Sequence, residues 1–336
     1  MKQIVITKTG GPEVLEYQSA QIPVPGRNEI LIEVKAAGVN FADVLIRRGL
    51  YPDPTTIPMV PGFEVAGTVV DRGCSIDEKI LGKDVIAFTK YTGYAEYVTA
   101  ERFQVFDKPA HLNFEEAAAL PVNYLTAYQL LVIMCAVKAG EKVLIHNAGG
   151  GVGLAAFTIA KHAGATIYGT ASLRKHNMLY SFGYDHMMTY GEWDREVRDK
   201  TNGHGVDIVL DCVGGSHWRK SYRALGSGGR LGMYGMSCTC KNCWWAKAKL
   251  LSTVLKMPWF HPVGLMKSNR GVFGVHLGEM WGESEKIKRW MKAIINGIEE
   301  KSTLPYLDKV FNYKDADLAH NYLESRQNIG KVVLVP

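Results

Sequence analysis

The first third of the chain alternates between short apolar runs and turn-forming residues. The runs include QIVIT, EILIEVKAAGV, EVAGTVV and DVIAF, and glycine and proline separate them in GGPE, PVPGRNE and YPDPTTIP. Several short strands with turn signals between them are typical of an all-β barrel or sandwich. Near Asn113 the pattern becomes helical, and we predict a helix over NFEEAAALPVNYLTAYQLLV with Asn113 as its N-cap.

From Lys142 onward, strand-like runs alternate with helical segments. The runs KVLIH, ATIYGTA, VDIVLDCVG and GRLGMYG are separated by segments such as GLAAFTIAKHAG. This alternation predicts a parallel, doubly wound sheet. The last segment, VFNYKDADLAHNYLESRQNIGKVVLVP, is predicted as strand, helix and strand, and its two ends look like the first third. We therefore expect the C-terminus to return to the N-terminal unit.

Composition narrows the class of protein. The chain has 336 residues, with 39 Lys and Arg against 33 Asp and Glu, and the cations are scattered. Nothing resembles a basic nucleic-acid-binding arm. Six cysteines are too few for a disulfide framework, the N-terminus does not resemble a signal peptide, and no apolar run reaches about 18 residues. We expect a cytoplasmic protein without a transmembrane segment.

A glycine-rich loop, NAGGGVG, lies between the strand KVLIH and the next helix. The strict GxGxxG fingerprint fails, because position 154 is leucine. The position between strand and helix is nevertheless that of a dinucleotide-binding loop. Glycine lets a pyrophosphate approach the backbone, and the helix N-terminus offers free N–H groups to it. A tight turn that needs only small residues is the alternative. The predicted cofactor contacts are Gly149, Gly150, Gly151, Val152 and Gly153.

The end of the second strand distinguishes between cofactors. An NAD site usually has Asp or Glu about 20 residues after the loop, to bind the ribose hydroxyls. The segment GTASLRKH offers Thr170, Ser172, Arg174 and Lys175 instead, and no acidic residue. Hydroxyls and cations suit a 2′-phosphate, so the sequence predicts NADPH rather than NADH. The alternative for Arg174 and Lys175 is a solvated helix start.

Several long motifs, in order, resemble the medium-chain dehydrogenase/reductase superfamily. GGPEVLEY, AAGVNFADVLIRRGLYP, PGFEVAGTVV, AGGGVGLAA and GVDIVLDCVGG resemble its quinone oxidoreductase branch, and LPVNYLTAY, GTASLRKH and NIGKVVLVP resemble the vesicle amine transport protein group within it. The resemblance implies an α/β protein with a GroES-like catalytic domain over residues 1–121. It also implies a Rossmann NADPH-binding domain over 122–300 and a return to the catalytic domain over 301–336. Relatives are commonly homodimers or homotetramers, and we expect a homodimer.

The same resemblance bears on metal binding. Zinc alcohol dehydrogenases of this superfamily bind catalytic zinc through two cysteines and a histidine, and the corresponding positions here are Asn40, Phe63 and Asn123. Glu64 follows, but a zinc site needs three or four suitable ligands. The segment that carries structural zinc in those relatives has no cysteine here. We expect no metal.

A cysteine cluster, CTCKNC, lies after the strand GRLGMYG. Cys238, Cys240 and Cys243 supply three ligands where a structural zinc site wants four. A remote histidine, His217 or His261, is the alternative fourth ligand. We interpret the cysteines as loop residues in a segment that varies within the family. Nearby aromatic residues are expected to cover the substrate cleft or a subunit contact: Trp244, Trp245, Trp259 and Phe260.

Without a metal, hydrogen-bond donors must stabilise charge on the substrate oxygen. The motif GVNFADVLIRRGLY lies against the nicotinamide and substrate in the resembling family. Asn40 is expected to orient the substrate, Tyr51 to donate to its oxygen and Asp43 to fix local structure. The alternatives are a structural turn for Asn40 and a packed loop aromatic for Tyr51. Isolated histidines such as His146 and His162 are interpreted as structural or surface residues.

Further cofactor contacts are implied by the resemblance alone. They are Asn123, Thr126, Tyr190, Gly214, Tyr234, Gly235, Phe273, Gly274 and Asn328. The predicted function is reduction of quinones or α,β-unsaturated carbonyls by NADPH without zinc. One alternative is reduction of an enoyl thioester or a pathway-specific double bond. Another is an NADPH-binding protein associated with vesicle or lipid transport, with little catalysis.

Overall fold

A computed structural model describes residues 1–53, 56–239, 252–300 and 305–336. The chain forms two compact units, Met1–Leu125 with Leu277–Pro336, and Thr126–His276. The sequence predicts domain boundaries at residues 122 and 301, and these boundaries stay a prediction.

The first unit is built on a mostly antiparallel sheet, in which only β14 and β15 pair in parallel among the described strands, and its short strands agree with the alternating runs of the sequence. Among the described residues its strand order is β14-β15-β3-β4-β5-β7, and β6 also pairs with β3. A separate hairpin joins β1 (Lys2–Ile6) to β2 (Leu15–Ser19). The sheet strands are β3 (Glu29–Val39), β4 (Glu64–Arg72), β5 (Asp84–Phe88), β6 (Tyr97–Glu101), β7 (Val105–Asp107), β14 (Leu307–Asn312) and β15 (Lys331–Val335).

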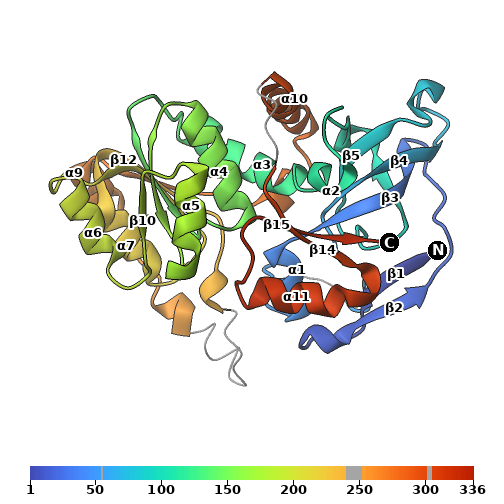
Figure 1. Ribbon diagram of the computed structural model, residues 1–336, viewed down its shortest axis with the longest axis horizontal. Helices are drawn as coiled ribbons and strands as arrows, with labels where there is room; N and C mark the ends of the chain where they lie inside the picture. Colours follow the sequence, from blue (N-terminus) through green and yellow to red (C-terminus); the bar gives the residue numbers. More distant parts are fainter. Residues whose placement is uncertain (54–55, 240–251, 301–304) are drawn as a thin grey trace. The chain divides into compact units, whose positions relative to one another are not determined.

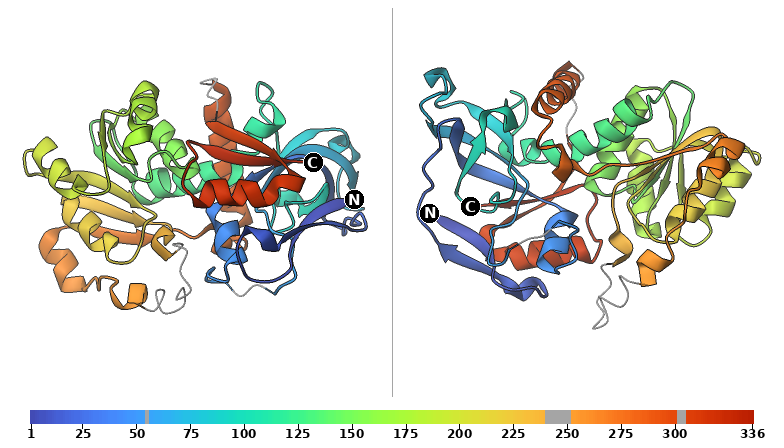
Figure 2. Two further views of the ribbon diagram at one scale, coloured as in Figure 1. Left: turned by 60° about the horizontal axis from the view of Figure 1, so that its bottom comes forward. Right: turned by 180° about the vertical axis from the view of Figure 1, so that it is seen from behind.

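The C-terminal strand completes this sheet. β15 pairs antiparallel with β3, with Val332 opposite Val39 and Val333 opposite Gly38. Figure 2 shows the red C-terminal strands beside the blue strands of the N-terminal segment from two sides. The pairing places Lys331, the first residue of β15, near the end of β3 and the start of helix α1.

Helices and single helical turns connect and cover the strands of the first unit. They are α1 (Phe41–Arg47), α2 (Phe114–Ala117), α10 (Ser284–Glu300) and α11 (Ala316–Glu324), with single turns η1 (Pro12–Val14), η2 (Glu78–Ile80), η3 (Arg102–Gln104), η7 (Leu277–Met280) and η8 (Tyr313–Asp315). Asn113 caps α2 as predicted: its side chain accepts from the Glu116 N–H at 2.8 Å, and the Asn113 N–H donates to Glu116 Oε2 at 3.0 Å.

The helix predicted after Asn113 is interrupted. A second helix, α3 (Pro121–Tyr128), begins at a proline and continues into the π-helical turn η4 (Gln129–Met134). Proline lacks the N–H needed inside a helix and disfavours helical geometry in the residue before it, so the break falls there. Among the described residues, the stretch Phe114–Met134 has the length and composition of a membrane span, and 67% of its most apolar 18-residue window is buried. Buried core helices pass the same test.

The second unit is the predicted parallel, doubly wound sheet. Its order is β10-β9-β8-β11-β12-β13. Helices α4 and α5 cover one face, and α6 and α7 cover the other (Figure 1). Strands are β8 (Lys142–His146), β9 (Thr166–Thr170), β10 (His186–Met188), β11 (Val206–Asp211), β12 (Leu225–Met233) and β13 (Gly271–Gly274). Helices are α4 (Gly151–His162), α5 (His176–Phe182), α6 (Trp193–Lys200), α7 (His217–Ala224) and α9 (Pro262–Ser268), with turns η5 (Leu173–Lys175) and η6 (Ser237–Thr239).

Candidate functional site

The turn from β3 into α1 carries the first group of polar side chains. Asn40 has extended backbone geometry and directly precedes α1. Its N–H donates to Asp43 Oδ2 at 2.8 Å. Asp43 is fully buried and accepts two further bonds, from the Gly62 N–H and the Tyr94 hydroxyl, each at 3.0 Å. These contacts tie the start of α1 to two other segments, which fits a structural role for Asp43.

Burial dominates the electrostatics of Asp43. It raises the pKa of this carboxyl group to about 7, although the three hydrogen bonds and the charge of Lys331 lower it. Tyr94 extends the network, because its hydroxyl lies 3.3 Å from His320 Nε2. Burial in turn lowers the pKa of His320 to about 3. The buried ring is therefore neutral at physiological pH.

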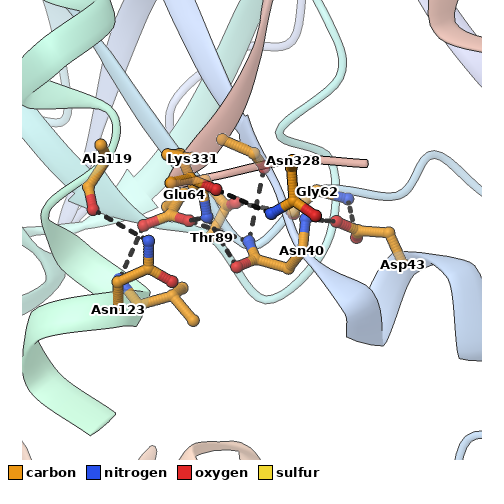
Figure 3. A network of polar contacts seen from close by, with 12 residues as sticks. Asn40, Asp43, Gly62, Glu64, Thr89, Ala119, Asn123, Asn328 and Lys331 are labelled. Carbon is orange, nitrogen blue, oxygen red and sulfur yellow. Dashed lines mark hydrogen bonds and ion pairs between the residues drawn. The ribbon is translucent and has the colours of Figure 1, made fainter. Parts of the chain in front are cut away.

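Glu64 and Lys331 form a buried ion pair beside Asn40 (Figure 3). Lys331 Nζ also donates to Asn40 Oδ1 at 2.7 Å, and Asn40 Nδ2 donates to Glu64 Oε1 at 2.8 Å. The other oxygen of Glu64 accepts from the Val122 N–H at 2.7 Å. Glu64 is 0% exposed, Lys331 2% and Asn40 7%. The three side chains therefore form one closed network of charge and amide.

Tyr51 lies in an aromatic cluster of the first unit. Its ring centroid is 6.1 Å from that of Phe63, which in turn lies 5.3 Å from the ring of Tyr91. Burial raises the pKa of Tyr51, and the negative charge of Asp53 raises it further. The hydroxyl is therefore protonated at neutral pH and can donate a hydrogen bond.

In the second unit, the glycine loop connects β8 to α4 as predicted. Gly150 is the N-cap of α4, and Gly151, Val152 and Gly153 form its first turn. A Cβ on Gly153 would lie 2.4 Å from the carbonyl oxygen of Asn147, so only glycine allows this approach of helix and loop. The strict fingerprint places its last glycine one residue later, at position 154.

The predicted 2′-phosphate residues differ in their surroundings. Thr170 is fully buried, and its hydroxyl bonds to His146 Nδ1 at 2.9 Å, so it belongs to the interior. Ser172 is exposed. Lys175 is buried, and its Cδ lies 3.3 Å from where a Cβ of Gly149 would be. Lys175 and the glycine loop are therefore neighbours.

A buried polar network joins the ends of β8 and β11 to α7. Ser221 Oγ donates to Asp211 Oδ2 at 2.6 Å and lies 3.1 Å from His146 Nε2, and His217 Nδ1 lies 2.7 Å from the same carboxylate oxygen. Burial alone would raise the pKa of Asp211, but these hydrogen bonds and the nearby histidines lower it to about 2. Burial lowers the pKa of His146 to about 3. His146 is thus a core residue, which agrees with its interpretation as a structural rather than a surface histidine.

The remaining predicted contacts are spread over several elements. Phe273 and Gly274 lie on β13, and Gly214, Tyr234 and Gly235 follow the ends of β11 and β12. Tyr190 is 38% exposed after β10. Asn123 and Thr126 are buried on α3, where Asn123 Nδ2 donates to the Ala119 carbonyl at 3.3 Å. Asn328 donates to the Gly330 carbonyl at 2.8 Å, next to Lys331.

Sequence reasoning assigned no role to Lys331, Asp211 or Ser221. For Lys331, the available signal was a lysine at the start of an apolar strand, in NIGKVVLVP, because buried lysines are rare.

Cys238 is half-buried, whereas Cys240, Cys243, Trp244 and Trp245 lie outside the described residues. Trp259 is 99% exposed, and Phe260 packs with its ring centroid 5.2 Å from that of Tyr222.

Comparison with known proteins agrees with this architecture. Residues 26–127 match the alcohol dehydrogenase GroES-like domain, and residues 151–294 match the zinc-binding dehydrogenase family. The rat synaptic vesicle membrane protein VAT-1 homolog is 35% identical, covering 100% of this chain and 84% of that protein. Human quinone oxidoreductase is 29% identical, covering 100% of this chain and 98% of that protein.

Two solved structures extend the comparison. A mycobacterial protein in complex with NADPH has a TM-score of 0.88 at 30% identity, with 100% of both chains covered. The CurK enoyl reductase has a TM-score of 0.85 at 30% identity, covering 99% of this chain and 98% of that chain. The chain therefore belongs to the medium-chain dehydrogenase/reductase superfamily, in the branch of quinone oxidoreductases and VAT-1 homologues, and is an oxidoreductase of that class.

Proposed function

We propose that the protein reduces quinones or α,β-unsaturated carbonyl compounds with NADPH and without a metal ion. The observation that carries this proposal is the closed network of Asn40, Glu64 and Lys331. Of these residues, Asn40 stands at a position where zinc relatives have a metal ligand. The amides of Asn40 and Asn123 and the phenyl ring of Phe63 stand where those relatives have the thiolate and imidazole groups that zinc prefers.

The second unit supplies the residues for the cofactor. The N–H groups at the start of α4, together with Gly149 and Gly150, suit a pyrophosphate. Ser172 and Lys175 suit the 2′-phosphate of NADPH, because a buried ammonium beside the loop favours a dianion. When bound, NADPH supplies the hydride. That a mycobacterial relative was solved with NADPH supports the same cofactor here.

The first unit supplies groups for the substrate. Tyr51 is the proposed donor to the substrate oxygen, because its raised pKa keeps the hydroxyl protonated. Hydride addition leaves two electrons on the substrate and requires one proton to reach its oxygen, which Tyr51 can provide and regain from solvent. Asn40 is proposed to orient the substrate side of the site through its fixed position at the start of α1.

NADPH consumption by the purified protein tests the proposal. The panel is a naphthoquinone, an ortho-quinone, an enone and an alkenal, with NADH in parallel. Turnover of at least one panel member with preference for NADPH is expected, and Y51F should lower kcat with little change in NADPH affinity. Folded protein that binds NADPH in a fluorescence titration but turns over none of the panel would contradict the substrate class. Failure to bind NADPH would contradict the cofactor.

A second candidate is the reduction of an enoyl thioester. The similarity to the CurK enoyl reductase over nearly the whole chain favours it. Turnover of a crotonyl thioester far above that of the quinones would establish this alternative.

We also propose a cytoplasmic homodimer. Light scattering after size-exclusion chromatography tests the dimer, and co-sedimentation with vesicles tests the location.

A further inference from the structure

Lys331 is a cation in the interior of the first unit. Its side chain is almost fully buried, and it contacts Glu64 Oε1 and Asn40 Oδ1. Lysine is almost never buried to this extent unless it is paired. Because an ammonium group loses its hydration on burial, its retention at this position needs a reason beyond packing.

The fold makes room for this ammonium group. β15 pairs with β3 so that Gly38 lies opposite Val333, two residues beyond Lys331. A Cβ on Gly38 would lie 2.5 Å from Glu64 Oε1 and 2.7 Å from Lys331 Cε. Glycine at this position therefore leaves the space through which the lysine side chain reaches the carboxylate. The pairing of β15 with β3 and the absence of a side chain at Gly38 together allow the contact between Lys331 and Glu64.

The residues at this place do not fit a zinc ion. Of the positions that correspond to zinc ligands, Phe63 offers a phenyl ring, and Asn40 and Asn123 offer neutral amides. The oxygen of Asn40 accepts from Lys331, and both oxygens of Glu64 already accept hydrogen bonds. A divalent cation would also lie close to the ammonium charge and be repelled by it. The site therefore disagrees with the metal that the matched family name implies.

We propose that Lys331 takes the place of the catalytic metal: its ammonium group is the cation of the site, paired with Glu64, and Lys331 is the positioning residue for Asn40. The amide of Asn40 has a single favourable orientation, because flipping it would turn its NH₂ group toward the ammonium and its oxygen toward the carboxylate. Asn40 in turn begins α1, the helix that leads to Tyr51. The catalytic part of this proposal rests on the proposed reductase function, whereas the metal part does not.

The metal part is tested on the wild-type chain. Purified protein is incubated with zinc, desalted and analysed for bound metal, alongside E64Q and C240S. We expect that the wild-type protein binds no zinc. Zinc that is retained in E64Q and lost in C240S would lie at the cysteine cluster, and it would agree with the proposal as well. One equivalent of zinc that is lost in E64Q and retained in C240S would overturn the proposal. This measurement needs no activity, so it is independent of the proposed function.

The positioning part is tested by removing one charge or both. K331M leaves the Glu64 carboxylate buried without its cation, and we expect its unfolding midpoint in urea to fall. E64Q/K331M removes both charges and should recover most of that midpoint. Its kcat should stay at least about tenfold below that of the wild type, because misplaced groups lose catalysis even when binding is kept, while the KM for NADPH is unchanged.

The double variant separates the two roles of the lysine. Wild-type kcat in E64Q/K331M would show that the ammonium only neutralises Glu64, and would overturn the proposal. If the double variant does not fold, K331A in the presence of small alkylammonium ions provides the second measurement. Rescue of kcat by ethylammonium but not by ethanol is expected, and equal effects of the two would overturn the proposal. Wild-type protein without turnover would instead point to failure of the proposed function.

Discussion

Gly153 is the third residue of helix α4, and it packs directly against the loop that precedes the helix. A Cβ at this position would lie 2.4 Å from the carbonyl oxygen of Asn147 and 2.9 Å from that of Ala148. Both oxygens belong to the backbone, so no side-chain rotation relieves the clash. We predict that G153A moves the start of α4 away from the glycine loop.

The size of the effect follows from these distances. Ordinary van der Waals contact begins at 3.4 Å, so the helix and the loop must separate by about 1 Å. Overpacking of this kind costs about 1–3 kcal/mol, and the better helix propensity of alanine returns up to about 1 kcal/mol. We expect a net loss of about 1–2 kcal/mol in the free energy of unfolding. NADPH affinity should fall by about tenfold, because the N–H groups of the first turn are displaced from the pyrophosphate.

Urea unfolding followed by circular dichroism, and an NADPH fluorescence titration, measure the two effects. G264A is the matched control: Gly264 is also the third residue of its helix in the same unit, but nothing lies within 4 Å of its Cβ position. This control should be neutral or stabilise by up to about 1 kcal/mol. If G153A unfolds like the wild type and binds NADPH equally well, the packing argument is wrong.

Three further predictions concern buried and charged groups. Burial lowers the pKa of His146 and of His320 to about 3, so their stability contribution is present above pH 6.5 and lost as the pH falls. Between pH 7 and pH 5 the free energy of unfolding should fall by about 2 kcal/mol less in H146N, and in H320N, than in the wild type, and an equal fall would contradict burial of the ring. K175A should weaken NADPH binding about tenfold and NADH binding little; equal losses in titrations would exclude a 2′-phosphate contact. S221A should cost about 2 kcal/mol in urea unfolding, because Asp211 loses a buried donor, and a neutral result would contradict this.

Local patterns were sufficient for much of the architecture. The strand and helix periods predicted both the β-rich first unit and the parallel sheet, because each period depends on neighbouring residues alone. Asn113 was recognisable as a cap, since its partner Glu116 is three residues away. The glycine loop was recognisable from its place between a strand and a helix. Only the structure showed that Gly153 has no room for a side chain, because the Asn147 carbonyl oxygen packs against it.

The candidate site depended on partners far apart in the chain. Lys331 lies 291 residues from Asn40 and 267 from Glu64 in the sequence. No local period predicts such a pair, because its formation depends on β15 joining β3. The same holds for Ser221, whose partner His146 is 75 residues away.

The sequence by itself determined the fold class, the family and the type of cofactor loop, because these follow from periodicity, glycine placement and ordered motifs. Tertiary structure alone decided which polar side chains are buried, which of them are paired and how their pKa values shift. Burial removes water from a charged group, and only the folded chain brings the partner that replaces it. That is why Lys331 looked like an ordinary strand residue in the sequence and is an internal cation in the structure.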